Sequence, residues 1–359
     1  MTESPVPLPV SSVLLAELVA CPGPPGQEDA VRAAVASYVT RLGLPSSTDA
    51  RGNLLVPLGE RALEKPRIVV TAHLDEIALM ATDIDADGGL SVSPLGGVYP
   101  WKWGEGPVEI LAGTTRKPTM LAGVLSFGGI HTNSPLSAAQ QSRDGRALTW
   151  DMARVLTGLS PQALAKAGVR PGSRVIMARQ RRTLWPLGSD LIASYFLDDR
   201  ADIVAWLLAL AELRQDSAFE DVLFVATASE EVGGLGALYL LRERPAEIVI
   251  ALEIGPTTPD NPLALTPDPT IWISDSYASM IPTDIAMAES CARKLNFTPR
   301  FQALTRGGSD ASCAAAQGLC ARPITLAFAA DNSHGFEIMH KDAPEALAKL
   351  LIAILHKVA

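Results

Sequence analysis

The stretch Arg67-Ile-Val-Val-Thr-Ala-His-Leu-Asp75 places a histidine and an aspartate directly after an apolar run that is typical of a buried strand. Four more apolar runs, at residues 191–197, 222–228, 248–252 and 324–329, are followed by side chains that can bind a metal ion. These side chains are Asp198 with Asp199, Glu230 with Glu231, Glu253, and His334. In an open α/β sheet, the carboxyl ends of the strands line one crevice. The pattern therefore predicts an α/β fold that brings these groups to one point.

Helical and strand patterns alternate at both ends of the chain. Residues 11–20 and 27–41 have apolar positions at helical spacing, whereas 53–57 and 67–72 are typical of strands. From about residue 198 the alternation resumes, and it ends in an amphipathic helix over residues 344–358. This order favours a mostly parallel sheet with helices on both faces. We assign residues 1–79 and 189–359 to this α/β domain.

Residues 80–188 have a different composition. Turn dipeptides and prolines recur, and short alternating segments such as 108–112 and 120–125 indicate strands. Residues 147–169 favour a helix, and 169–177 a turn into a returning strand. We interpret 80–188 as a small β-rich domain inserted into the α/β domain. Such an insertion would separate His73 from Asp198 in sequence without separating them in space.

The bulk properties exclude several classes of function. A formal net charge of -9 argues against nucleic acid or an anionic membrane as a partner. The N-terminal residues include a glutamate and several prolines and lack a basic region, so we expect no secretory leader. No apolar stretch reaches the length of a membrane span. The cysteines have no CxxC spacing and indicate buried thiols: Cys21, Cys291, Cys313 and Cys320. These features predict a cytoplasmic protein.

His73 and Asp75 lie on the same side of a strand end, because alternate residues of a strand point the same way. His73 suits a metal ligand, and Asp75 suits the carboxylate that fixes its tautomer. Alternatively, the two residues only cap a neighbouring loop. Asp198 and Asp199 begin a helix, where capping accounts for one aspartate but leaves the other unexplained. We expect Asp198 to bridge two metals with its two oxygens.

Glu230 and Glu231 would repel each other unless a positive charge lay beside them. One glutamate can bind a metal while its neighbour acts as general base, although a solvated acidic turn is the alternative. The glycines that follow lack the spacing of a dinucleotide-binding loop. With Glu253 and His334, the set suits a pair of divalent ions, zinc or cobalt. A metal-dependent hydrolase is the leading interpretation.

The ordered set resembles the tetrahedral aminopeptidases, which are cytoplasmic di-metal exopeptidases. The resemblance extends from about residue 10 to the C-terminal helix. The family includes glutamyl, leucyl and deblocking aminopeptidases, and some members carry an endoglucanase label. The matching motifs are Thr71-Ala-His-Leu-Asp-Glu-Ile-Ala-Leu-Met80, Leu197-Asp-Asp-Arg-Ala201, Glu230-Glu-Val-Gly233, Gly307-Gly-Ser-Asp310, and Ser333-His334 with Glu337 following.

The resemblance implies a role for each matching residue. One metal would be held by His73, Asp198 and Glu253, and the other by Asp198, Glu231 and His334. Glu230 would be the catalytic base and Asp75 would orient His73. The enzyme would release the N-terminal residue of peptide substrates by means of a water that bridges the metals. Residues 80–188 would form a dimerisation domain, and the homo-oligomer would be a dodecameric tetrahedral shell.

Three positions depart from the family pattern. Glu253 stands where aminopeptidases usually have aspartate, and Asp202 stands where glycine is usual. Residues 254–262 also differ from the typical loop. Glutamate at position 253 is frequent in related di-metal enzymes, so a deacylase or a carboxypeptidase is an alternative. A catalytically inactive relative is another alternative. A glycoside hydrolase would leave both histidines without a role.

Overall fold

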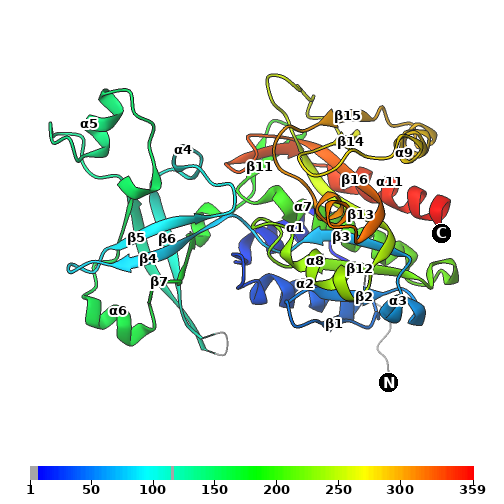
Figure 1. Ribbon diagram of the computed structural model, residues 1–359, viewed down its shortest axis with the longest axis horizontal. Helices are drawn as coiled ribbons and strands as arrows, with labels where there is room; N and C mark the ends of the chain where they lie inside the picture. Colours follow the sequence, from blue (N-terminus) through cyan, green and yellow to red (C-terminus); the bar gives the residue numbers. More distant parts are fainter. Residues whose placement is uncertain (1–6, 115–116) are drawn as a thin grey trace.

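The computed structural model describes residues 7–114 and 117–359, and it contains a large sheet with helices on both faces and a smaller closed barrel (Figure 1). Four parallel strands form the centre of the large sheet, in the order β12 (Val222–Thr227), β3 (Ile68–His73), β13 (Ala246–Pro256) and β16 (Cys320–Asp331). Nearly all of their residues are buried, as expected for parallel strands covered on both faces.

Antiparallel pairing extends this parallel centre at both edges. On the β12 side the sheet continues through β2 (Leu54–Pro57) and β1 (Ser47–Thr48). On the β16 side it continues through β17 (Glu337–His340), β11 (Leu191–Ser194) and β10 (Trp185–Leu187). Strand β14 (Pro269–Ser274) also pairs with β16, and β15 (Arg300–Ala303) pairs with β14. The predicted α/β fold is confirmed, with a parallel centre and mostly antiparallel edges.

Helices cover both faces of this sheet because successive residues of each central strand point to opposite sides. Val70 of β3 packs in the core of the first face, and Val69 packs in that of the second. The helices of the first face are α1 (Ser11–Ala20), α2 (Asp29–Arg41), α7 (Leu197–Leu213), α9 (Pro282–Lys294) and α11 (Ala343–Val358). Those of the second are α3 (Glu60–Glu64), α8 (Leu235–Glu243) and α10 (Asp310–Ala316).

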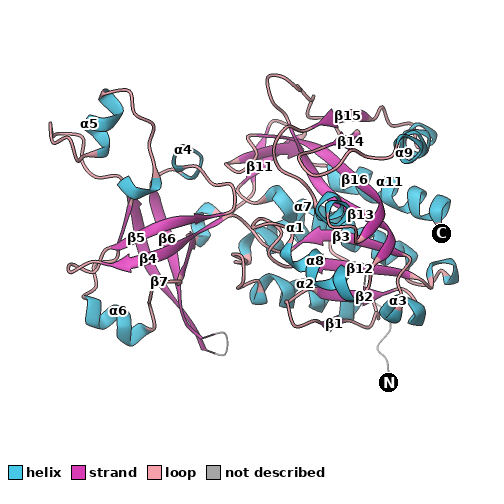
Figure 2. Cartoon of the chain, viewed as in Figure 1, coloured by secondary structure: helices cyan, strands magenta, loops and turns pink. Residues whose placement is uncertain are grey.

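The barrel lies beside the large sheet as a separate group of strands (Figure 2). Around the barrel the order is β4 (Ala78–Ile84), β5 (Leu90–Leu95), β8 (Arg154–Leu156), β7 (Lys117–Ser126), β6 (Gly106–Thr114) and β9 (Arg174–Met177). It has its own hydrophobic core, which includes Leu79, Val108 and Val175. The predicted β-rich insertion is therefore present. Strand β10, although inside 80–188, pairs with β11 in the large sheet.

Short helices connect the barrel strands: α4 (Pro100–Trp103), α5 (Ala138–Arg143) and α6 (Pro161–Ala167), with 3₁₀ turns at Trp150–Met152 and Arg179–Arg181. The helix predicted over 147–169 is shorter than expected. It begins after Ser160, whose hydroxyl accepts a hydrogen bond from the Ala163 amide, and it ends at Gly168 in the left-handed region. These two caps leave residues 154–156 free to form β8.

Two expectations about the chain as a whole can be compared with the structure. Within the described ranges, no helix is long and apolar enough to cross a membrane. All four cysteines are free thiols, and three of them are buried, while Cys21 is half-buried. The interpretation of the cysteines as thiols in the protein interior agrees with this.

Candidate metal centre

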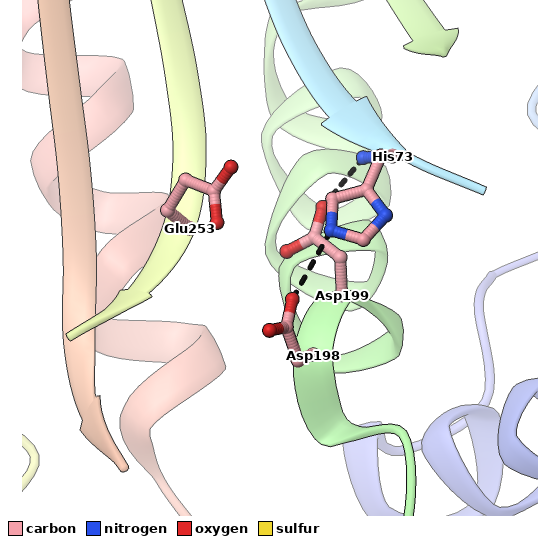
Figure 3. A group of neighbouring side chains, drawn as sticks. All are labelled: His73, Asp198, Asp199 and Glu253. Carbon is pink, nitrogen blue, oxygen red and sulfur yellow. Dashed lines mark hydrogen bonds and ion pairs between the residues drawn. The ribbon is translucent and has the colours of Figure 1, made fainter. Parts of the chain in front are cut away.

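The predicted side chains meet where the central strands end. They come from six segments: His73 ends β3, Asp75 follows it, Asp198 begins α7, Glu230 and Glu231 follow β12, Glu253 lies on β13, and His334 lies between β16 and β17. Figure 3 shows three of these elements pointing their side chains toward one another. His73 and Asp198 are 125 positions apart in the sequence, yet they lie together in the fold.

A first group consists of His73, Asp198, Asp199 and Glu253. Each offers one ligand atom, and these atoms all lie within 4.8 Å of one another (Figure 3). His73 Nε2 is 3.1 Å from Asp198 Oδ1. All four side chains are buried, so water does not screen their charges.

A second group consists of Asp198, Glu231 and His334, whose ligand atoms also lie within 4.8 Å of one another. His334 Nε2 is 3.5 Å from Asp198 Oδ2 and 3.8 Å from Glu231 Oε2. Asp198 is the member common to both groups. It turns Oδ1 toward His73 and Oδ2 toward His334, which is the arrangement that a bridging carboxylate needs.

Both histidines are held in the tautomer that a metal ligand requires. His73 Nδ1 lies 3.1 Å from the backbone carbonyl oxygen of Asp75, and His334 Nδ1 lies 3.0 Å from that of Gly97. A carbonyl oxygen only accepts hydrogen bonds, so each neutral ring must carry its proton on Nδ1. The lone pair is then on Nε2, which faces the carboxylates.

Asp75 contacts other residues of the site in addition to His73, its predicted partner. Its buried carboxylate accepts hydrogen bonds from the backbone amides of Glu230, at 2.8 Å, and Glu231, at 3.1 Å. The same carboxylate is 3.6 Å from His73 Nδ1, which is farther than the backbone carbonyl of Asp75. Asp75 therefore orients His73 mainly through its backbone, and it positions the glutamate pair through its side chain.

The electrostatics of the cluster call for positive charge. Burial would raise the pKa of Asp198, but hydrogen bonds from His334 and His73 outweigh burial and lower it. Burial raises the pKa of Glu231 to about 7 despite the nearby His334. Burial and the charge of Glu230 also raise the pKa of Glu253 well above its ordinary value. So many buried carboxyl groups are stable as carboxylates only beside cations.

The raised pKa of His73 and the unpaired oxygens of Asp199 and Asp202 also indicate that the cluster needs positive charge. Burial alone would lower the pKa of His73, but the surrounding carboxylates, Asp199 first, raise it well above the ordinary value. Within the described chain, Asp199 Oδ1 and both oxygens of Asp202 are buried without a hydrogen-bond partner. The imidazole nitrogens and carboxylate oxygens present here fit divalent metal ions.

Two supporting residues, Glu337 and Asp199, were named in the sequence analysis but were given no role there. Glu337 accepts hydrogen bonds from the amides of Asp198, at 3.0 Å, and His334, at 2.9 Å, and burial raises its pKa to about 8. Asp199 Oδ2 accepts the amide hydrogen of His73 at 2.5 Å. The second aspartate of the pair was a signal that capping did not explain. Glu337 follows the His334 motif in the family pattern, but its role was not predictable because its partners are set by the packing of β17.

The cluster lies at the bottom of a cavity of about 650 Å³. Glu230 lines this cavity, with its pKa raised well above the ordinary value by burial and by neighbouring carboxylates, although His73 opposes the shift. Aromatic side chains form much of the remaining wall: Tyr99, Trp101, Trp272 and Tyr277. Two cations, Lys102 and Arg306, also reach it. An open cavity of this size above a buried ligand cluster can admit a substrate to the metals.

Comparisons with known proteins identify the family of the chain. The model of the M42 glutamyl aminopeptidase family matches residues 52–350. A lysyl aminopeptidase of Pyrococcus furiosus is 27% identical over 243 residues, which cover 67% of this chain and 65% of that protein. A putative aminopeptidase of Acetivibrio thermocellus is 24% identical over 302 residues, which cover 83% of each chain.

A solved structure has the same fold. It is the TET1 peptidase of Pyrococcus horikoshii, which can assemble into a tetrahedron or a large octahedral shell. It superposes with a TM-score of 0.82 at 24% identity, covering 96% of this chain and 99% of that one. The resemblance to the tetrahedral aminopeptidases is thereby confirmed. Because the family match covers most of the chain, this protein belongs to the M42 glutamyl aminopeptidase family and is by class a metallo-aminopeptidase.

Proposed function

We propose that this protein uses two divalent metal ions to hydrolyse the N-terminal peptide bond of peptides. The observation that supports this most is the position of Asp198, whose two oxygens face two separate ligand groups. In this proposal His73, Asp198 and Glu253 hold one ion, and Asp198, Glu231 and His334 hold the other. Asp199 supports His73 by accepting its amide hydrogen.

The donor set favours zinc or cobalt, because each proposed site combines one imidazole with carboxylate oxygens. Bound ions of this kind supply Lewis acidity and lower the pKa of a water to near neutrality. Glu230 lies next in sequence to the ligand Glu231 and lines the cavity, and we assign it the role of general base. Its carboxylate takes the proton of the attacking water and passes it to the leaving amine nitrogen.

Burial raises the pKa of Glu230 above its ordinary value, which is the direction that a base that later acts as an acid requires. Asp75 fixes the backbone of Glu230 by accepting its amide hydrogen at 2.8 Å. We therefore propose that the proton transfer depends on both Glu230 and Asp75. Asp75 acts by positioning, since its carboxylate is fully buried and bonded to backbone amides.

A second candidate function is favoured by Glu253. Related di-metal enzymes that act at carboxyl termini or on acylated amines often have glutamate where the aminopeptidases have aspartate. The chain would then be a deacylase or a carboxypeptidase with the same ligands. The two functions differ in whether the substrate needs a free N-terminal amine.

We further infer that the protein is a cytoplasmic homo-oligomer. Free thiols in the interior are typical of proteins in reducing compartments. We propose residues 80–188 as the dimerisation domain of a catalytic domain formed by 1–79 and 189–359. Exposed apolar side chains on neighbouring barrel strands, Met120 and Val124 of β7 and Leu156 of β8, support a contact between subunits. A related solved structure is a dodecamer, which makes a dodecameric tetrahedral shell the proposed assembly.

The test is hydrolysis of a panel of aminoacyl anilides, each in free and N-acetylated form, by protein reloaded with zinc or cobalt. We expect cleavage of the free-amine members alone, and their ranking identifies the side chain that the cavity prefers. Cleavage of the acetylated members would favour a deacylase. If neither form is cleaved although two metals are bound, the aminopeptidase proposal is wrong, and peptides with free carboxyl termini become the next substrates.

A further inference from the structure

We propose that the inserted barrel completes the second metal site, because its Gly96–Gly97 turn positions the ligands His334 and Glu231. This inference rests on the proposed metal assignment. The two glycines directly follow β5 of the barrel, yet Gly96 approaches Glu231 and Gly97 approaches His334, both in the α/β part of the molecule. They are thus positioning residues contributed by a domain that otherwise carries no ligand.

The first contact fixes the tautomer of His334. Its Nδ1 lies 3.0 Å from the carbonyl oxygen of Gly97, so Nδ1 donates and Nε2 keeps the lone pair for a metal. The imidazole side chain is 30% exposed, and without this bond it would be held on one side only. Hydrogen bonds of this kind orient a ligating histidine and raise its basicity.

The second contact is steric. A Cβ added to Gly97 would lie 3.0 Å from His334 Nδ1 and 3.2 Å from its Cε1, so the ring would have to move. A Cβ added to Gly96 would lie 3.1 Å from Glu231 Oε2. Gly96 also has φ of +84°, which side chains rarely adopt. The turn therefore packs against both ligands that belong to the second group alone.

A third contact holds the loop that carries His334. Lys102 of α4 donates from Nζ to Asn332 Oδ1 at 2.5 Å, and Asn332 Nδ2 donates to the Phe336 carbonyl at 2.9 Å. Asn332 and His334 have φ of +59° and +57°. Such left-handed conformations cost energy in residues other than glycine, and they persist only where the surroundings hold them. The barrel supplies part of that support through Lys102.

Among the described residues, the contacts that hold the ligands of the first metal site do not involve the Gly96–Gly97 turn. His73 is bonded to Asp75 and Asp199, and the amide of Asp198 is bonded to Glu337. These partners all belong to the α/β part of the chain. A perturbation of the barrel turn should therefore weaken the second site and leave the first unchanged.

The test is the variant Gly97→Ala, with Gly129→Ala as its control. Gly129 lies in a barrel loop where an added Cβ meets nothing within 4 Å, and its φ does not require glycine. Cobalt is titrated into each metal-free protein, followed by its visible absorption, and bound metal is counted by elemental analysis. We expect Gly97→Ala to bind the first equivalent normally and the second at least about tenfold more weakly, as for other losses of ligand support. Gly129→Ala should match the wild type.

A second variant tests the same proposal in case Gly97→Ala does not fold. Lys102→Met removes the contact to Asn332 without adding a side chain to the turn, and Lys166→Met, at an exposed site on α6, is its control. We expect Lys102→Met also to weaken the second equivalent alone. Circular dichroism establishes that each variant is folded, and if Gly97→Ala is not, Lys102→Met decides the question.

The outcomes separate this inference from the proposed function. If the wild type does not bind two equivalents, the proposed metal assignment itself fails. If the wild type binds two, and the folded variants bind both with unchanged affinity, the positioning role of the barrel is refuted. Equal weakening of both equivalents would also refute it, because the proposed contacts reach only His334 and Glu231.

Discussion

Arg200 is a buried cation that ties α7 to the segment following β3, and its replacement by methionine should destabilise the fold. Arg200 and Glu76 are both 0% exposed, and Arg200 Nη2 lies 2.6 Å from Glu76 Oε2. The guanidinium also donates to the backbone carbonyls of Leu74 and Leu18. Arg200 Nη1 also donates to the backbone carbonyl of Asp75, at 3.4 Å, so the charge pair contacts the residue that holds the proposed base.

The magnitude follows from this burial. At an effective dielectric constant of about 20, opposite charges 2.6 Å apart attract by about 6 kcal/mol. The loss of solvation offsets much of this attraction. Breaking the pair from one side leaves Glu76 buried without a partner, which costs about 3–5 kcal/mol. Methionine fills most of the space of the arginine stem, so we attribute little of the loss to a cavity.

The assay is urea unfolding followed by circular dichroism at pH 7. We expect Arg200→Met to lower the free energy of unfolding by about 3–5 kcal/mol, and the double variant with Glu76→Gln to recover part of the loss. The control is Arg293→Met, which breaks the exposed pair with Glu289 and should cost at most about 1 kcal/mol. A loss for Arg200→Met as small as that of the control would refute the reasoning.

Three further predictions concern the metal centre. Glu230→Gln should keep both metals while kcat falls about 10²–10⁴-fold, and near-normal turnover would exclude Glu230 as the base. His334→Ala should lose one of two metals, as counted by elemental analysis, and tight binding of two equivalents would contradict its role as a ligand. Burial raises the pKa of Asp202 from 3.8 to about 8, so the folded metal-free protein holds a proton that the unfolded chain releases between these pH values. Stability without metal should therefore fall as the pH rises from about 4 to about 8. Thermal melts in chelator should show a flatter fall for Asp202→Asn, and an unchanged slope would contradict the assignment.

The sequence was sufficient to predict the sheet and the residues at its carboxyl edge. Apolar runs located the strands that lead to His73 and Glu253, because strands buried on both faces consist almost entirely of apolar residues. The crevice rule for α/β sheets then brought together residues that are far apart in the chain. The predicted proximity of His73 and Asp198 is observed, because His73 Nε2 lies 3.1 Å from Asp198 Oδ1.

The supporting contacts were not predictable in the same way. The Glu337 carboxylate accepts hydrogen bonds from the amides of Asp198 and His334, and the Gly97 carbonyl contacts His334 across the domain boundary. No periodic pattern in the sequence encodes where such a carboxylate or loop carbonyl lies. Asp75 was expected to act on His73 through its carboxylate, which lies 3.6 Å from His73 Nδ1 and also accepts the amide hydrogens of Glu230 and Glu231. The spacing of His73 and Asp75 within one strand identified Asp75 as a site residue. Its hydrogen bonds to the amides of Glu230 and Glu231 depend on how the turn after β12 packs, which the spacing does not encode.

The barrel is inserted into the chain next to residues of the candidate metal centre. Strand β4 begins at Ala78, three residues after Asp75, and the returning chain packs Phe196 into the barrel core two residues before Asp198. The centroids of the Phe196 and Trp103 rings lie 6.4 Å apart, so the barrel holds the residue that leads into Asp198, the proposed bridging ligand. Packed interiors transmit small displacements because they have little free space. A local change in the Gly96–Gly97 turn would reach only His334 and Glu231, whereas a displacement of the whole barrel would reach Asp75, Asp198 and His334 together. If the barrel also forms the proposed contact between subunits, assembly and metal binding would be coupled through these three residues.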